Sequence, residues 1–329
     1  MSEIILEVKA LTKHFDVSNG LFRKKGKVRA VEQVSFDVYQ SETLGIVGES
    51  GSGKSTLGRL ILRLLSPTAG SVVYKGMDIL KQSSQEFRAI RSELQMVFQD
   101  PYASLNPRIK IGDAISEPML ANKKVANVKE ARAKTLELLE LVGLRTEMFQ
   151  RFPHEFSGGQ RQRISIARAL ALEPKILVCD EAVSALDVSV QAQILNLFNQ
   201  LKRQLDLTYI FISHDLAVVK YISDRILVMY LGEVMEIAPT EQLFAKTYHP
   251  YTEALISSIP EPSTKGKKQR IILQGDIPSA LNPPSGCKFN TRCFKKMEIC
   301  NTIHPEILEL EPGHFVRCHL YSKGGVDLG

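Results

Sequence analysis

The first part of the chain alternates between apolar and polar side chains in short blocks. Residues 4–8 and 34–38 alternate as half-buried strands do, and residues 43–47 form a short apolar run of strand type. Residues 56–62 begin an apolar segment that is compatible with a helix, and it continues to residue 65. Between the last strand and this helix lies a loop rich in glycine and serine. The pattern therefore predicts a strand, a loop and a helix in direct succession.

Strand and helix patterns continue to alternate through the rest of the chain. Residues 128–143 place Leu136, Leu139 and Val142 on one helical face, and Gly143 is suited to end that helix. Further strands are predicted at 71–74, 94–98, 176–179, 208–213, 224–230 and 233–237, and further helices at 161–172 and 190–201. This alternation predicts an α/β fold with a helical insert at about residues 100–165.

Length and composition are those of a soluble globular protein. The chain has 329 residues, of which 44% are hydrophobic and 24% are charged, so it has room for one large or two modest domains. The net charge is +6. The local basic runs at 23–27 and 265–268 are interpreted as solvated loops, and binding to anionic lipid or nucleic acid is the less favoured alternative. Neither a signal peptide nor an apolar run of about 18 residues is present, so any membrane role is expected to come through a partner.

The loop from Gly48 to Ser55 fits the phosphate-binding pattern G-x-x-x-x-G-K-[ST] at every fixed position. Glycine backbone amides and the following helix N-terminus favour an anion. Lys54 is expected to reach the β- and γ-phosphates, and Ser55 to hold Mg²⁺. The nucleotide contacts predicted in this stretch are Gly48, Glu49, Ser50, Gly51, Ser52, Gly53, Lys54, Ser55 and Thr56.

Three acidic or amide side chains stand at the ends of predicted strands. Gln99 follows the strand at 94–98, and its amide is suited to bind Mg²⁺ and to orient water. Asp180 and Glu181 follow the apolar run at 176–179. One carboxylate for the metal (Asp180) and one to polarise the attacking water (Glu181) is what hydrolysis of a phosphoanhydride requires.

Two further features are ambiguous when each is taken alone. Ser157, Gly158, Gly159 and Gln160 stand at the start of a predicted helix, where they form either a second anion site or merely an N-cap. His214 ends the strand at 208–213, where it either contacts the γ-phosphate or serves the structure. Their order along the chain favours the functional interpretation of both.

In this order, these stretches resemble the ABC-transporter ATPase superfamily over roughly residues 3–245. The resemblance implies a P-loop NTPase (RecA-like) core with an antiparallel β subdomain. It also implies two ATP molecules sandwiched in a dimer, with residues 157–160 of one subunit facing the phosphate loop of the other. Phe15 matches the position of the family's adenine-stacking aromatic, although propensity alone favours a core residue. Two departures, Phe156 for leucine and Ala182 for proline, leave the catalytic positions in place.

A narrower resemblance to the ATPase subunits of oligopeptide/dipeptide permeases rests on three stretches, at 102–107, 249–251 and 281–287. It divides the chain into a nucleotide-binding domain at 1–250 and a C-terminal tail at 251–329. It implies ATP-driven import with two transmembrane permease subunits, an extracytoplasmic binding protein and a homologous ATPase subunit, which is a paralogue by family habit. The chain would then lie at the cytoplasmic face of the membrane.

Four of the five cysteines lie in the tail, at Cys287, Cys293, Cys300 and Cys318, and Cys179 lies alone in an apolar strand. Four thiolates suit Zn²⁺ or an iron–sulfur cluster, and disulfides rank last in a cytosolic chain. Structural zinc sites usually have more closely spaced pairs. The permease resemblance implies a small C-terminal four-cysteine domain with a [4Fe–4S] cluster that acts as a structural clip, with zinc as the alternative.

Two functions remain open from the sequence. The first is the ATPase of an importer for di- or oligopeptides, with ATP and Mg²⁺ as its substrate and cofactor. The second is a soluble ABC-type ATPase that acts on nucleic acid or ribosomes. The sequence has no single basic stripe with interleaved aromatic residues and no duplicated ATPase half, so we expect no nucleic-acid partner.

Overall fold

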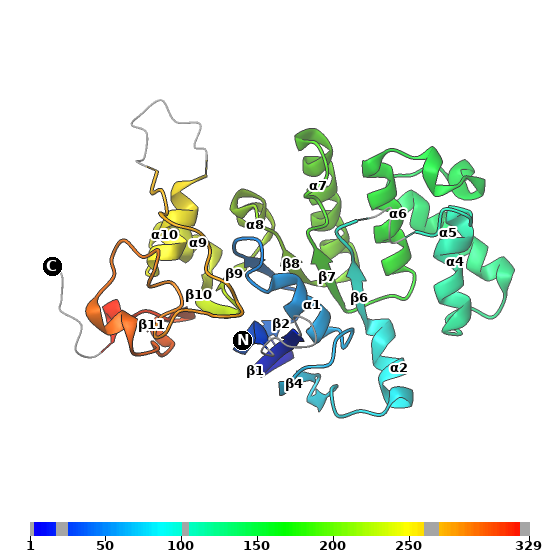
Figure 1. Ribbon diagram of the computed structural model, residues 1–329. Coiled ribbons are helices and arrows are strands. Elements are labelled where there is room, and N and C mark those ends of the chain that lie inside the picture. Colours follow the sequence, from blue (N-terminus) through cyan, green and yellow to red (C-terminus); the bar gives the residue numbers. More distant parts are fainter. Residues whose placement is uncertain (1–2, 18–25, 101–104, 260–269, 323–329) are drawn as a thin grey trace. The chain divides into compact units, whose positions relative to one another are not determined.

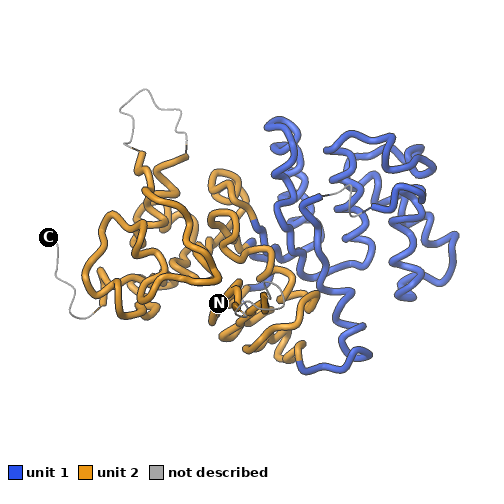
Figure 2. The backbone as a smooth tube through the Cα atoms, viewed as in Figure 1, with its two compact units in different colours: residues 1–3, 39–43, 81–212 blue, residues 4–38, 44–80, 213–329 orange. Residues whose placement is uncertain are grey.

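The computed structural model describes residues 3–17, 26–100, 105–259 and 270–322. These form two compact units (Figure 2): unit 1 contains the described residues within 1–3, 39–43 and 81–212, and unit 2 contains those within 4–38, 44–80 and 213–329. The basic run at 265–268, most of the run at 23–27 and residues 102–104 of the permease-type stretch lie outside the described residues.

Unit 1 is built on three parallel strands (Figure 1), β6 (Leu94–Val97), β7 (Ile176–Asp180) and β8 (Thr208–Ile212). In register, Ile176 lies between Leu94 and Thr208. Every residue of β7 and β8 is buried, which explains their continuous apolar runs. The strands predicted here are confirmed. Asp180 is the last residue of β7, and β8 ends at Ile212, two residues before His214.

Helices supply the rest of unit 1. The helix predicted at 128–143 is confirmed as α5 (Val128–Leu141), and Gly143 follows it with φ +73°, as a C-terminal glycine should. A capping box between Ser83 and Glu86 starts α2, which the apolar pattern did not predict because it buries few side chains. The helices of this unit are α2 (Ser84–Glu93), α4 (Ile111–Ala121), α5, α6 (Gly158–Leu170) and α7 (Val188–Leu205), with 3₁₀ turns η1 (Thr146–Gln150) and η2 (Pro153–Glu155).

Unit 2 contains an antiparallel sheet in the order β2-β1-β4-β5. Its strands are β1 (Ile4–Val17), β2 (Gly26–Tyr39), β4 (Ala69–Tyr74) and β5 (Met77–Asp78). The first two are longer than predicted. A bulge at Ala10, with φ +46°, shifts the register of β1, so Leu11 and Thr12 are both buried and the alternation breaks there. The predicted end of β1 at residue 8 is therefore too early, because the strand continues past the bulge to Val17.

A second group of strands in unit 2 carries the phosphate loop. Strand β3 (Thr43–Val47) pairs in parallel with β9 (Arg225–Tyr230), and β10 (Glu233–Pro239) pairs antiparallel with β9. Two tail strands that the sequence pattern did not predict extend this group: β12 (His314–Val316) pairs with β10, and β11 (Leu308–Glu311) pairs with β12. Residues 308–316 of the tail therefore extend the group of strands that includes β3, the strand that leads into the phosphate loop.

Short helices complete unit 2. Helix α1 (Lys54–Ile61) ends earlier than predicted, because Arg63 adopts φ +52° and Leu64 is exposed. The others are α8 (Leu216–Ile222), α9 (Thr240–Ala245), α10 (Pro250–Ser257), η3 (Glu298–Asn301) and η4 (His319–Tyr321). None of the described helices has both the length and the hydropathy needed to cross a membrane.

Candidate nucleotide site

The phosphate loop has the strand–loop–helix context that the sequence predicted, between the end of β3 and the start of α1. Two of its glycines cannot be replaced without strain. A Cβ on Gly48 would lie 2.1 Å from the Met229 carbonyl oxygen, and one on Gly53, where φ is +99°, would lie 2.1 Å from the Ala30 carbonyl oxygen. Neighbouring backbone therefore packs against the loop too closely for any other residue type.

Lys54 lies inside the curve of this loop. Its side chain is buried, and its ammonium donates to the carbonyl oxygens of Gly48 at 2.7 Å and Glu49 at 2.9 Å and to the Ser52 hydroxyl at 3.3 Å. The N-cap residue of α1 is Gly53, which has no side chain to cover the first helical amides. A cation and a helix N-terminus at the same turn form a site for a phosphate group.

Glu49 is held from the C-terminal region of the same unit. Its carboxylate accepts two hydrogen bonds from the Arg292 guanidinium, at 2.6 Å and 3.1 Å. Its backbone N–H donates to the Tyr251 hydroxyl at 2.9 Å. The Glu49 carboxylate, by hydrogen bonding and charge, raises the pKa of Arg292. The sequence predicted Glu49 as a nucleotide contact, but it did not predict Arg292 or Tyr251 as its partners.

The carboxylates predicted for metal and water lie in unit 1. Asp180 is the buried last residue of β7, and Glu181 follows it with φ +49°. The Gln99 amide donates to a carboxylate oxygen of Glu181 at 2.7 Å. The structure thus brings together Gln99 and Glu181, which are 82 residues apart in sequence.

Ser157 and Gln160 form a capping box at the start of α6. The Gln160 N–H donates to the Ser157 hydroxyl at 3.3 Å, and the Ser157 N–H donates to the Gln160 side-chain oxygen at 3.0 Å. Close packing explains one glycine between them, because a Cβ on Gly159 would lie 2.4 Å from a methyl group of Val190. Ser157 is therefore the N-cap of α6, and the capping box fixes the backbone conformation from Ser157 to Gln160.

Phe15 and His214 both lie in unit 2 with exposed side chains. Phe15 is 37% exposed on β1, and the Lys13 ammonium lies 5.0 Å from its ring centroid. The alternative that Phe15 is a core residue is wrong, because so exposed a ring is not part of the core. In sequence, His214 stands two residues after the end of β8 and two residues before the start of α8.

The tail cysteines all carry free thiols, as does Cys179. Burial raises the pKa of Cys287 and of Cys318 to about 12 and also raises that of Cys293, with smaller contributions from the neighbouring cysteines. Across the described parts of the chain, no group of three or more His, Cys, Asp or Glu side chains is placed so that it could hold a metal ion. The structure does not support the expected cluster, and the disulfide alternative is wrong. Cys179 is fully buried, as predicted for a small hydrophobic residue.

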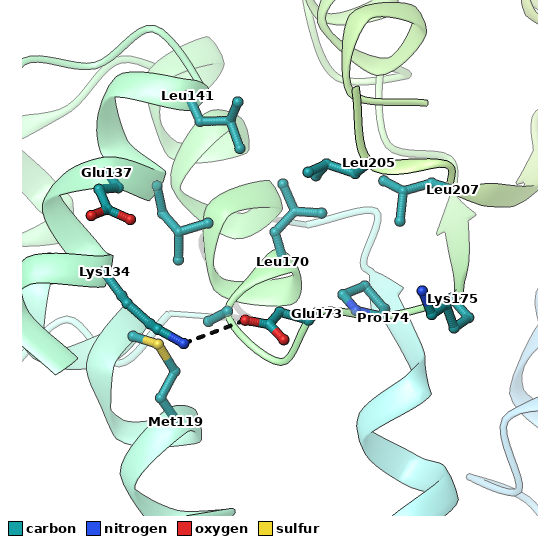
Figure 3. Close-up of a pocket in the computed structure, with 12 residues that line it drawn as sticks. Met119, Lys134, Glu137, Leu141, Leu170, Glu173, Pro174, Lys175, Leu205 and Leu207 are labelled. Atoms are coloured by element: carbon teal, nitrogen blue, oxygen red, sulfur yellow. Dashed lines mark hydrogen bonds and ion pairs between the residues drawn. The ribbon is translucent and has the colours of Figure 1, made fainter. Parts of the chain in front are cut away.

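Unit 1 also contains an apolar pocket of about 470 Å³ (Figure 3). Leucines dominate its wall, and the Lys134 ammonium pairs with Glu173 at 3.4 Å beside them. The residues that line it are Met119, Lys134, Glu137, Leu138, Leu141, Leu170, Ala171, Glu173, Pro174, Lys175, Leu205 and Leu207. They include none of the predicted nucleotide-site residues, so the pocket is separate from the ATP chemistry.

A phosphate loop between a parallel strand and a helix, together with a strand-end Asp-Glu pair, defines a P-loop ATPase. Two family models match the chain: "ABC transporter" at residues 31–184, and "Oligopeptide/dipeptide transporter, C-terminal region" at residues 235–300. The chain belongs to the family of ATP-binding subunits of oligopeptide/dipeptide ABC transporters. It is an enzyme that hydrolyses ATP.

The relatives extend over almost the whole chain. The oligopeptide transport ATP-binding protein AppF of Bacillus subtilis is 52% identical over 324 residues, which are 97% of this chain and 98% of the relative. The dipeptide transport ATP-binding protein DppF of Haemophilus influenzae is 49% identical over 314 residues, which are 95% of this chain and 96% of the relative. The solved ATP-binding cassette MJ0796, in a dimeric post-hydrolysis state with ADP and Pi, matches with TM-score 0.64 and 29% identity over 71% of this chain and 98% of its own.

Proposed function

We propose that this ATPase powers the uptake of di- or oligopeptides through transmembrane permease subunits. The observation that carries the proposal is the near full-length similarity to transport ATP-binding proteins named for oligopeptides and dipeptides, including a match to their C-terminal region. The alternative, an ABC-type ATPase that acts on nucleic acid or ribosomes, has no comparable support.

The chemistry of each side chain suggests its role in ATP hydrolysis. Lys54 would bind the β- and γ-phosphates, Ser55 and Asp180 would each serve as a ligand of Mg²⁺, and Glu181 would polarise the attacking water. The 2.7 Å hydrogen bond from Gln99 supports the role of Glu181, since an amide donor orients the carboxylate that accepts from it. Gln99 would contribute its amide oxygen to Mg²⁺ in the loaded site, and His214 would contact the γ-phosphate.

The remaining nucleotide contacts are divided between two ATPase subunits. Phe15 stacks on adenine, and its exposure on β1 supports this role. Ser157, Gly158, Gly159 and Gln160 act on the nucleotide of the opposite subunit, and their capping box holds them in one conformation. The second subunit is a paralogue in a heterodimer, with a homodimer as the alternative.

The other partners are proposed from the family. Two transmembrane permease subunits bind the helical insert and the loop after Gln99, and an extracytoplasmic binding protein delivers the cargo to them. The ATPase is then a peripheral protein at the cytoplasmic face of the membrane.

For the tail we propose a [4Fe–4S] cluster held by Cys287, Cys293, Cys300 and Cys318, with zinc as the alternative. Its support is the set of four cysteines within a short segment of the sequence, together with the effect of Cys293 and Cys300 on the pKa of Cys287 and of all three on the pKa of Cys318. When bound, the group would clip the tail together, and each thiol would have to lose its proton. Iron and sulfide analysis of anaerobically purified protein, before and after Cys293→Ser, tests this. Zinc without visible absorption would replace the cluster by a zinc clip.

The transport function is tested by uptake. A strain that lacks this protein is expected to lose uptake of labelled peptides, and the wild-type gene, but not Glu181→Gln, should restore it. A series of labelled dipeptides, longer peptides, sugars and metal chelates identifies the cargo. Unchanged peptide uptake together with salt-dependent RNA or DNA binding would instead favour the nucleic-acid alternative.

A further inference from the structure

The phosphate loop and the cysteine-bearing tail meet at one residue, Glu49. The two hydrogen bonds that its carboxylate accepts from Arg292 form a forked pair, which is the most directional geometry available to an ion pair. The Arg292 side chain is only 7% exposed and that of Glu49 is 25% exposed, so water screens the pair weakly. Such a pair fixes position in a way that a surface salt bridge does not.

Glu49 is held at its backbone as well. Its N–H donates to the Tyr251 hydroxyl, and its carbonyl oxygen accepts from the Lys54 ammonium at 2.9 Å. The residue therefore has three anchors: a tail arginine, a helix α10 tyrosine and the phosphate-binding lysine. Movement of Glu49 would change the position of the Lys54 ammonium directly.

The anchors themselves are rigidly supported by a buried aromatic cluster. The rings of Tyr230 and Tyr251 lie 4.8 Å apart, and Phe289 lies 5.3 Å from each of them. All three side chains are fully buried, and the Arg292 guanidinium lies 6.0 Å from the Tyr230 ring centroid. Phe289 and Arg292 stand between Cys287 and Cys293 in sequence, so the segment with two of the tail cysteines also contains the arginine and one of the rings that hold Glu49 in place.

We propose that Arg292, acting through Glu49, is a positioning residue for ATP binding, and that the C-terminal tail thereby sets the affinity of the phosphate loop for Mg-ATP. Tyr251 supports the same residue through its hydroxyl. The proposal rests on the ATPase activity of the family and is independent of the cargo.

Loss of Arg292 should weaken nucleotide binding without removing a catalytic group. Changes within such a coupling network alter binding by roughly 2- to 30-fold. We therefore expect Arg292→Ala to raise the dissociation constant for Mg-ATP, and the KM, by about tenfold, with kcat changed by less than about threefold. Arg292→Lys keeps the charge but loses the forked geometry, so its dissociation constant should fall between those of Arg292→Ala and wild type.

The test measures equilibrium binding of a fluorescent ATP analogue with Mg²⁺, and steady-state ATP hydrolysis, on the full-length chain. Glu49→Ala and the double variant with Arg292→Ala complete a cycle, in which the double should bind no more weakly than the weaker single variant. Lys295→Ala is the matched control. It breaks a neighbouring tail ion pair, Lys295 to Glu253 at 2.7 Å, that is solvent-exposed and remote in sequence from the phosphate loop.

A thermal melt of each variant separates positioning from folding. The proposal is overturned if folded Arg292→Ala binds Mg-ATP within twofold of wild type, if kcat falls while KM stays constant, or if the two single effects add in the double variant. It is also overturned if Lys295→Ala weakens binding equally. Should Arg292→Ala fail to fold, Arg292→Lys and Glu49→Gln decide by the same criteria.

Discussion

Acidification is expected to loosen the start of helix α10, because its N-cap is a histidine that works only when neutral. The Nδ1 atom of His249 accepts the Tyr251 N–H at 3.0 Å, and a protonated imidazole has no lone pair for this bond. Burial lowers the pKa of His249 to about 4, against an upward contribution from the nearby Glu236 carboxylate. Glu236 in turn accepts the His249 backbone N–H at 3.1 Å and pairs with His314 at 2.8 Å.

The sign and size of the effect follow from linkage. In the unfolded chain this histidine has its ordinary pKa of 6.5, so between pH 6.5 and about 4 the unfolded state binds more protons than the folded state. Stability from the neutral ring is complete above pH 6.5 and is lost progressively as the pH falls toward 4. A downward shift of this size corresponds to ~3 kcal/mol.

The assay compares wild type with His249→Asn, which can still cap the helix but does not titrate. Amide hydrogen exchange at α10, measured at several pH values from 7.5 to 4.5 and corrected for intrinsic exchange, reports local opening. Wild type should lose protection toward low pH by about two orders of magnitude more than His249→Asn, which follows from the same ~3 kcal/mol. Glu236 and His314 are present in both proteins, so the difference isolates His249. Parallel pH profiles for the two proteins would refute the reasoning.

Three further outcomes are expected. Glu181→Gln should bind Mg-ATP within about threefold of wild type but lower its turnover about 100-fold or more, in a steady-state phosphate-release assay; ordinary hydrolysis would remove the proposed role of this carboxylate. Gly53→Ala should abolish binding of the ATP analogue and lower the melting temperature, because its Cβ would lie 2.1 Å from backbone, whereas Gly51→Ala has nothing within 4 Å of its Cβ and should have the smaller effect. Phe15→Ala should raise the dissociation constant for ATP about tenfold, from a stacking contribution of ~1–3 kcal/mol, and a change below twofold would contradict adenine stacking.

The parts of the site that depend on local sequence could be predicted. The phosphate loop is a continuous stretch whose glycines, lysine and serine act together, so its pattern and its flanking strand and helix were sufficient. The position of Asp180 at a strand end followed from an unbroken apolar run that is buried on both faces. The hydrogen bond from Gln99 to Glu181 joins two parallel strand ends, and their placement was predictable even though the distance was not.

Contacts that depend on the tail could not be predicted. Strand β12 is only three residues long, which is too short for a period of two to be recognised, and β11 alternates leucine and glutamate over only four residues, the shortest run in which such a period counts. Arg292 has no motif around it that indicates an ion pair with a residue 243 positions away. The sequence 249–251 did stand out by resemblance, but its physical roles, an N-cap and a hydroxyl partner for Glu49, need the folded chain.

Part of this chain has no counterpart in the solved cassette MJ0796. The cassette MJ0796 aligns over 98% of its own length but only 71% of this chain, and the C-terminal region here has its own family match at 235–300. A complete ATP-binding cassette therefore exists without part of this chain. If the tail were indispensable for folding the phosphate loop, such a cassette would have no reason to be stable. We therefore expect removal of the contact between Arg292 and Glu49 to change ATP affinity by about tenfold rather than to abolish binding.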